Sequence, residues 1–294
     1  METDNWRTNI NDYTLVVTSA CNSNCIMCPS PEYARRKNDA RSYSEIEEEV
    51  LNMPDNIKHI TVTGGEPTLL GKNFFSLMAS LSERQRLVPV LYLTNGRAFA
   101  SYEYGRLFVA NSRESDTVAI PIHASNSALH DRIAQVEGSF AQTVKGLKNI
   151  ALSKACIEIR IVVSKLNAYD VKQIVQLIVG DLPRVTVVNF IALEMTGNAA
   201  KNKDDLWIGY EKAFVAVKPG IELLLKGKIE VNLYNWPLCA VERGYWGMAK
   251  QSISSYKVRF AQECEFCSVR EICGGEFASN RFGNYFAVKP VGGM

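Results

Sequence analysis

Cysteines are the residues of this chain whose spacing most clearly suits chemistry. Three of the eight lie close together, at Cys21, Cys25 and Cys28, in the stretch CNSNCIMC. Three thiolates cannot complete a tetrahedral metal site. The spacing C-x3-C-x2-C suits a cubane iron–sulfur cluster in which one iron has no protein ligand, and a substrate or cofactor could bind that iron.

Four more cysteines gather near the C-terminus, at Cys239, Cys264, Cys267 and Cys273. Four thiolates satisfy either a tetrahedral zinc ion or a fully ligated cubane cluster. A third arrangement is a zinc ribbon in which Cys264 and Cys267 complete a site begun by Cys25 and Cys28. Cys156 stands alone before a predicted strand and is interpreted as a small core side chain.

Alternating strand and helix patterns must position these cysteines. Short apolar runs rich in β-branched residues predict strands over residues 13–19, 59–65, 89–96, 117–123, 157–164 and 184–193. Capping boxes are predicted at Ser44 with Glu47 and at Ser139 with Gln142, and a helix over 210–228 is predicted to be interrupted near Pro219. Strands separated by helices indicate a parallel α/β sheet, either doubly wound or part of a barrel.

Polar residues cluster where the predicted strands end, which is where parallel α/β folds place their sites. The cysteine triplet follows the first strand, and TGGEPT follows the second. LTNGR follows the third, His123 and Ser125 close the fourth, and Arg160 and Ser164 lie on or just beyond the fifth. His123 and His130 are interpreted as structural, because no partner carboxylate can be identified from sequence.

CNSNCIMC at the end of one strand and GGEP at the end of the next together resemble the radical S-adenosylmethionine (SAM) superfamily. The resemblance implies that Cys21, Cys25 and Cys28 hold a [4Fe–4S] cluster whose fourth iron is chelated by SAM. It further implies reductive cleavage of SAM to a 5′-deoxyadenosyl radical that takes a hydrogen atom from the substrate.

The resemblance also implies SAM contacts. Gly64 and Gly65 would let the backbone approach the cofactor, and Glu66 would accept a hydrogen bond from the SAM ammonium. Met27 stands where the superfamily often has an aromatic residue near the adenine. The remaining expected SAM contacts are Thr94, Asn95, Ser125, Arg160 and Ser164.

The C-terminal cysteines resemble the auxiliary-cluster extensions called SPASM and twitch domains. The SPASM pattern has a further cysteine where this chain has Phe277, so we expect one auxiliary [4Fe–4S] cluster rather than two. The resulting expectation is an α/β fold, a partial (β/α)6 TIM-type barrel over residues 1–200 with a small cysteine-rich auxiliary-cluster domain over 201–294.

A finer resemblance extends from about residue 14 to residue 279. CNSNCIMC, TGGEPTLLG, LTNGR, IPIHASNSALHDRI, LYNWPLC and QSISSYK with CEFCSVREICGGEFAS resemble the C-type radical SAM maturase of His-Xaa-Ser peptide systems. This likeness implies a small precursor peptide, a second radical SAM maturase protein and an external electron donor. About a dozen residues precede the first predicted strand, so precursor recognition is expected to rest on a partner, the C-terminal domain or the barrel mouth.

Composition limits the alternatives. The net charge is +2, and the basic residues are dispersed except for a run at residues 35–37, which argues against nucleic-acid binding. No stretch suits a signal peptide or a membrane span, so a cytoplasmic protein with reduced thiols is expected. The alternatives are a radical SAM enzyme acting on RNA or a small molecule and, more remotely, a non-enzymatic zinc or iron–sulfur electron-transfer protein.

Overall fold

One sheet organises the chain. The computed structural model describes residues 8–9, 12–30, 41–182, 184–250, 257–283 and 285–292. The basic run at 35–37 and the stretch QSISSY at 251–256 lie outside the described residues. Within the described residues, the sheet runs in chain order from β1 to β9; β1 is antiparallel to β2, and every later neighbour pair is parallel.

The first six parallel strands, β2 to β7, begin close to where the apolar runs predicted them. The parallel strands are β2 (Asp12–Thr18), β3 (His59–Gly64), β4 (Val90–Leu93), β5 (Thr117–Pro121), β6 (Cys156–Val162), β7 (Val185–Ile191), β8 (Glu230–Tyr234) and β9 (Ala249–Lys250), and β1 is Thr8–Asn9. The predicted α/β fold of a partial TIM-type barrel is confirmed.

The parallel part of the described sheet has eight strands rather than the six predicted. β8 and β9 lie beyond residue 200 and still extend it, since Val188 of β7 is in register with Val231 of β8. The division into domains 1–200 and 201–294 stays a proposal, and the sheet crosses that boundary.

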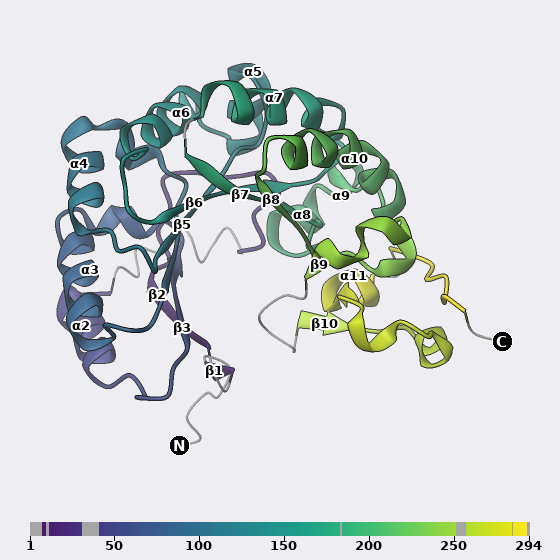
Figure 1. The fold of residues 1–294 in the computed structure, drawn as a ribbon, viewed down its shortest axis with the longest axis horizontal. Coiled ribbons are helices and arrows are strands. Elements are labelled where there is room, and N and C mark those ends of the chain that lie inside the picture. The colour runs from purple at the N-terminus through teal and green to yellow at the C-terminus, as the bar shows by residue number, and fades with distance from the viewer. Residues whose placement is uncertain are drawn as a thin grey trace.

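Helices cover the outer side of the curved sheet, and the C-terminal segment lies at its open side (Figure 1). The covering helices are α2 (Tyr43–Leu51), α3 (Asn73–Arg84), α4 (Tyr102–Asn111), α5 (Ser127–Ala134), α6 (Ser139–Asn149), α7 (Val171–Asp181) and α10 (Tyr210–Lys226). Short helices α8 (Gly197–Lys201) and α9 (Lys203–Leu206) follow β7. No helix among the described residues is long and apolar enough to cross a bilayer.

The helix predictions need three corrections. The capping box of α2 is Ser42 with Glu45, two residues earlier than expected. Helix α6 has Gly138 at its N-cap, because the Ser139 hydroxyl donates instead to Asp131. Helix α10 is continuous through Pro219, which costs one main-chain hydrogen bond but does not break the helix.

A buried ion pair fastens the end of the barrel opposite the cysteines. Asp116, directly before β5, is 1% exposed and accepts a hydrogen bond from Arg113 Nη2 at 2.7 Å. It also accepts from the main-chain nitrogen of Val90 at the start of β4. This ion pair therefore serves stability, since the carboxyl ends of the strands, where the site lies, are at the other end of the barrel.

The C-terminal segment contains β10 (Val258–Arg259), β11 (Glu276–Phe277) and α11 (Ala278–Phe282). Asn280, fully buried, ties it to the barrel: its side chain accepts from the nitrogen of Met195 at 2.8 Å and donates to the carbonyl of Leu193 at 2.9 Å. It also donates to the Tyr210 hydroxyl at 2.8 Å. This anchor lies just beyond the end of β7, beside the cavity described next.

Candidate active site

A cavity opens at the carboxyl ends of the parallel strands, and the three N-terminal cysteines line it. Together with its mouth it encloses about 1250 Å³. Cys21, Cys25 and Cys28 lie in the loop after β2, and each contributes to the wall. Leu193, Glu194 and Phe277 also line the cavity, so the segment after β7 and the C-terminal segment both take part in its wall.

Hydrogen bonds fix the cysteine loop from both flanks. On one side, the nitrogens of Asn24 and Ile26 donate to the last carbonyls of α5, at 3.1 and 2.9 Å. On the other, the Asn198 side chain of α8 donates to the carbonyl of Cys25 at 3.0 Å, and its main-chain nitrogen donates to the carbonyl of Cys28 at 2.9 Å. The loop is therefore held by segments that join the barrel at two distant points in sequence.

Arg97 supplies a third attachment. Its Nη1 donates to the carbonyl of Asn22 at 2.6 Å and to the hydroxyl of Ser23 at 3.0 Å. Its Nε donates to Gln142 of α6 at 2.7 Å. The neighbouring Asn95 also reaches the loop, donating from Nδ2 to Asn22 Oδ1 at 2.7 Å.

The glycines of the GGE stretch are required by the cysteine loop itself. Gly64 has a φ of +152°, which residues with a side chain rarely adopt. A Cβ on Gly65 would overlap the carbonyl oxygen of Ala20, and the nitrogen of Gly65 donates to Thr18 at 2.7 Å. Both glycines line the cavity, where a close approach to a cofactor was expected. They also allow a close approach to the backbone before Cys21.

The carboxylate of Glu66 accepts hydrogen bonds from neighbouring residues of the chain. It is 1% exposed; Oε1 accepts from the nitrogen and hydroxyl of Thr68 and from the hydroxyl of Thr94, and Oε2 accepts from the nitrogen of Asn95. A carboxylate offers about four acceptor sites. A SAM ammonium bound to Glu66 would therefore have to share a carboxylate oxygen with one of these donors or displace that donor.

Of the other predicted SAM contacts, Met27, Thr94, Asn95 and Arg160 line the cavity. Met27 is 5% exposed and belongs to the same buried hydrophobic cluster as Ile133 and Leu193, so it forms part of an apolar wall. Arg160 bonds Glu158 through Nε.

Ser125 and Ser164 do not line the cavity. Ser125 donates from its hydroxyl and its nitrogen to Asp170, each at 2.6 Å. Ser164 is fully buried, and its nitrogen and hydroxyl both donate to Asn167 Oδ1. Either side chain would have to leave its present partner to reach a cofactor.

Two histidines interpreted as structural belong to the cavity wall. His123 Nε2 lies 3.9 Å from Cys25 Sγ, and the rings of His123 and His130 are 5.0 Å apart. Burial, reinforced by His130, lowers the pKa of His123 to about 3, and burial lowers the pKa of His130 to about 4. Both rings are therefore neutral at pH 7.

A second cavity holds the C-terminal cysteines. Cys239, Cys264, Cys267 and Cys273 all line it. Burial raises the pKa of Cys239 and of Cys264, and the sulfur of Cys273 adds to both shifts. The two cysteine sets line different cavities, so the zinc ribbon that would combine Cys25 and Cys28 with Cys264 and Cys267 is wrong.

Main-chain nitrogens point at the sulfur atoms of this second set. Leu238 and Gly275 donate to Cys273 Sγ at 3.3 and 3.4 Å, and Val291 donates to Cys267 Sγ at 3.4 Å. Such bonds stabilise thiolate ligands of iron–sulfur clusters and of zinc. In the described part of the chain, no three His, Cys, Asp or Glu side chains are gathered around a point where one metal ion would bind.

The strand β11 separates the two cavities. Glu276 lines the cavity of the second cysteine set, and the next residue, Phe277, lines the barrel cavity. Glu276 is 1% exposed and faces Arg281 at 3.7 Å. Burial raises the pKa of Glu276.

Sequence reasoning missed the contacts that come from elsewhere in the chain. Arg97 lay in a quoted stretch, LTNGR, without an assigned role, although a charged side chain directly after a strand end is a usable signal. Asn198 had no assigned role either. Nothing local in the sequence indicates that either reaches the cysteine loop.

An open parallel barrel with a three-cysteine loop at its carboxyl end defines the class of fold, and a family comparison gives its membership. Residues 15–178 match the radical SAM superfamily model, and the chain belongs to that superfamily. The radical SAM fold implies SAM and a [4Fe–4S] cluster. A search of curated proteins found no match.

Solved structures share the fold. SuiB from Streptococcus suis bound to the precursor peptide SuiA is 14% identical with a TM-score of 0.61, over 77% of this chain and 48% of SuiB. The protein anSMEcpe with bound AdoMet and Kp18Cys peptide is 19% identical, with a TM-score of 0.55, over 75% of this chain and 63% of that one.

A radical SAM methyltransferase from Sphaerobacter thermophilus is 14% identical with a TM-score of 0.56, over 76% of this chain and 65% of that one. The present chain spans about half of SuiB and less than two thirds of the other two. At these identities the likeness concerns the fold.

Proposed function

We propose that this chain is a radical SAM enzyme that abstracts hydrogen from a ribosomally made precursor peptide, in a maturation system of the His-Xaa-Ser type. The observation that carries the proposal is the convergence of Cys21, Cys25 and Cys28 with the GGE backbone in one cavity. The cavity extends to Glu194 and Phe277, which leaves wall beyond the cysteine loop for a substrate.

The donor set fits the cluster that the family implies. Three thiols line this cavity, and the four C-terminal cysteines, Cys239, Cys264, Cys267 and Cys273, line another. A cubane held by three thiolates keeps one iron for SAM, and when bound the pair supplies a 5′-deoxyadenosyl radical. The chain's own part is to hold the loop rigid through Arg97 and Asn198 and to present the GGE backbone to the cofactor.

Arg160 is the proposed partner of the SAM carboxylate. It lines the cavity, and its Nε is engaged by Glu158, which orients the guanidinium. Among the described residues, no hydrogen bond is made by its two terminal nitrogens, so they can form a bidentate pair with a carboxylate. Thr94 and Asn95 are proposed contacts from the next part of the wall.

We further propose an auxiliary [4Fe–4S] cluster at Cys239, Cys264, Cys267 and Cys273. The four thiols share one cavity, and main-chain nitrogens donate to two of them, which fits a fully ligated cluster. Metal analysis separates this from zinc: two cubanes predict about eight irons per chain. About four irons with one zinc would place zinc at the second site.

The peptide substrate is supported by the resemblance to His-Xaa-Ser maturases and by two structural neighbours that were solved with peptides. The direct test is co-expression with a short neighbouring reading frame that contains His-Xaa-Ser repeats. A crosslinked product would be lighter by two hydrogen atoms per crosslink in mass spectrometry. An unmodified peptide, with a second radical SAM maturase and an electron donor also present, would favour the alternative substrates, RNA or a small molecule.

A further inference from the structure

Two of the three histidines in this chain stand side by side next to the cysteine loop. His123 follows β5 and is 6% exposed; His130 lies on α5 and is 2% exposed. Their rings are inclined by 40°. His59, the third, lies at the far end of β3 with a side chain that is 65% exposed. Burying two imidazoles here is costly, because a buried polar nitrogen needs a partner.

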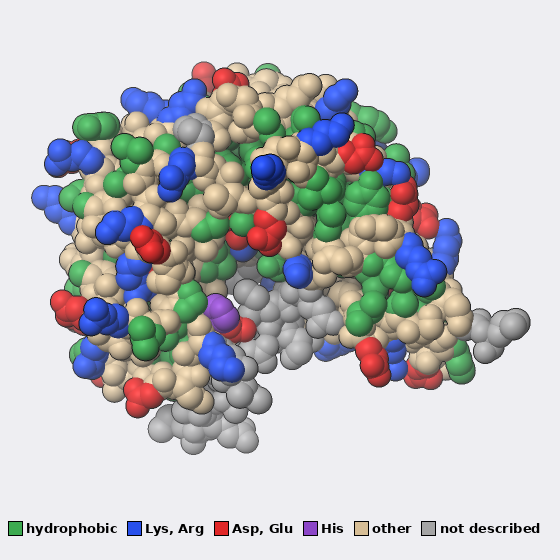
Figure 2. All heavy atoms as spheres, in the orientation of Figure 1, with side chains coloured by type: hydrophobic (Ala, Val, Ile, Leu, Met, Phe, Trp, Pro, Cys, Tyr) green, Lys and Arg blue, Asp and Glu red, His purple; other side chains and the backbone are tan. Residues whose placement is uncertain are grey.

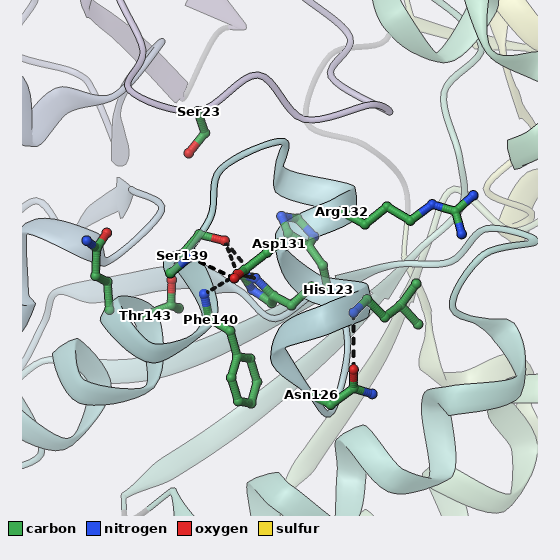
Figure 3. A network of polar contacts seen from close by, with 12 residues as sticks. Ser23, His123, Asn126, Asp131, Arg132, Ser139, Phe140 and Thr143 are labelled. Carbon is green, nitrogen blue, oxygen red and sulfur yellow. Dashed lines mark hydrogen bonds and ion pairs between the residues drawn. The ribbon is translucent and has the colours of Figure 1, made fainter.

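The proton of His130 can be assigned from its neighbours. The Ser139 hydroxyl donates to Asp131 Oδ1 at 2.7 Å, so its single proton is used (Figure 3). The oxygen of Ser139 must then accept from His130 Nδ1, which lies 3.1 Å away. A neutral His130 with a proton on Nδ1 carries a lone pair on Nε2, and among the described residues that atom has no hydrogen-bond partner.

The same reasoning applies to His123 once Cys25 is a ligand. A ligating cysteine is a thiolate and has no proton, so a hydrogen bond across the 3.9 Å between Nε2 and Sγ takes its proton from the imidazole. The main chain at His123 is fixed by Asn167, whose Nδ2 donates to its carbonyl at 3.0 Å. His123 Nδ1 is then the unprotonated nitrogen, and no described residue donates to it.

We propose that His123 donates a hydrogen bond from Nε2 to the Cys25 thiolate and thereby raises the reduction potential of the cluster held by the triplet. This inference rests on the proposed ligation by Cys21, Cys25 and Cys28. A donor near a thiolate stabilises the more negative, reduced cluster, which is how hydrogen bonds to sulfur tune such potentials. The ring of His130 packs beside that of His123, with the ring centroids 5.0 Å apart.

The test is a redox titration of the full chain after anaerobic reconstitution, followed by electron paramagnetic resonance. The SAM-binding cluster is recognised as the part of the reduced signal that changes when SAM is added. His123→Leu is expected to shift the midpoint potential of that signal downward. His123→Gln, whose amide nitrogen sits where Nε2 does, is expected to restore most of the shift, and His123→Asn, whose amide reaches only the Nδ1 position, is not.

His59→Gln is the matched control and is expected to leave the midpoint unchanged. If the SAM-responsive cluster signal is present in both proteins, equal midpoint potentials for the wild type and the Leu variant would overturn the inference. If the Leu variant does not fold, equal midpoints for the Gln and Asn variants would do the same. A wild-type protein without any SAM-responsive signal would instead contradict the proposed ligation by the triplet, and the role of His123 would fall with it.

Discussion

The guanidinium of Arg97 donates to the main-chain carbonyl of Asn22 across 2.6 Å, which joins the segment after β4 to the cysteine loop. Arg97 also holds Ser23 and Gln142. Two hydrogen bonds to the loop and one to α6, all from one planar group, preorganise a loop whose ligands must all face one cluster.

Replacing Arg97 by Gln should therefore lower iron loading at the triplet. Hydrogen bonds to a charged group are worth about 1.5–3 kcal/mol each, and the variant loses at least one of them. We expect less iron per chain and less SAM-responsive signal after reconstitution. Arg106→Gln, on the exposed face of α4, is the control; similar iron contents in both variants would contradict the preorganising role.

Gly65→Ala tests the packing of β3 against the loop. The added Cβ would overlap the Ala20 carbonyl, so the backbone before Cys21 must move. Overpacking of this kind costs about 1–3 kcal/mol of unfolding free energy. Gly180→Ala in α7 meets no atom within 4 Å and should stabilise by about 0.5–1 kcal/mol. Urea unfolding of the apo protein compares them, and equal effects would refute the close-approach argument.

Asn280→Ala tests how the C-terminal segment is held. The change leaves the Met195 nitrogen and the Leu193 carbonyl without their partner in a buried site, at a cost of about 2–4 kcal/mol. Faster proteolysis after residue 257 and faster hydrogen exchange there are expected. Asn56→Ala, at an exposed turn, should change neither rate. Unchanged exchange in the Asn280 variant would show that other contacts hold the segment.

The buried His130 predicts a loss of stability in acid. In the unfolded chain the imidazole takes up a proton below a pKa of about 6.5, while in the folded chain burial keeps its pKa at about 4. The unfolded state therefore binds more protons between these values, and stability falls as the pH falls through that window. Protonation of His130 in the unfolded state should lower the free energy of unfolding by about 1 kcal/mol between pH 7 and pH 5.5.

His130→Gln removes this contribution, although the lowered pKa of Asp131 and the neutral His123 remain. The variant should have a flatter dependence of unfolding free energy on pH, measured with urea at pH 7 and 5.5. The same slope in wild type and variant would show that His130 is not the group responsible. His59→Gln serves as the exposed control.

Local sequence predicted the elements but not their contacts. β-branched runs located strands β2 to β7, since parallel strands buried on both faces are apolar throughout. The capping box was displaced by two residues because both Ser42 and Ser44 have a glutamate three residues on. β8 lies in the range 201–294 that was assigned to the auxiliary-cluster domain, because its pairing with β7 spans a helix and a polar segment that local sequence does not connect to the barrel.

The surface agrees with the composition. Figure 2 shows basic and acidic side chains interspersed over the face it displays, without a continuous basic area. Ser164 is held by Asn167, only three residues away, whereas Ser125 is held by Asp170, 45 residues further along the chain, which no sequence pattern revealed. Long-range side-chain contacts of this kind are decided by the assembled fold.

The central claim is that Cys21, Cys25 and Cys28 hold the cluster at which SAM is cleaved, and formation of 5′-deoxyadenosine tests it most directly. The chain is reconstituted anaerobically and given SAM and a chemical reductant. We predict 5′-deoxyadenosine from the wild type, loss of it in Cys28→Ala, and retention in Cys264→Ala, because that residue lines the other cavity. Equal yields from the wild type and Cys28→Ala, or no product from either, would contradict the claim.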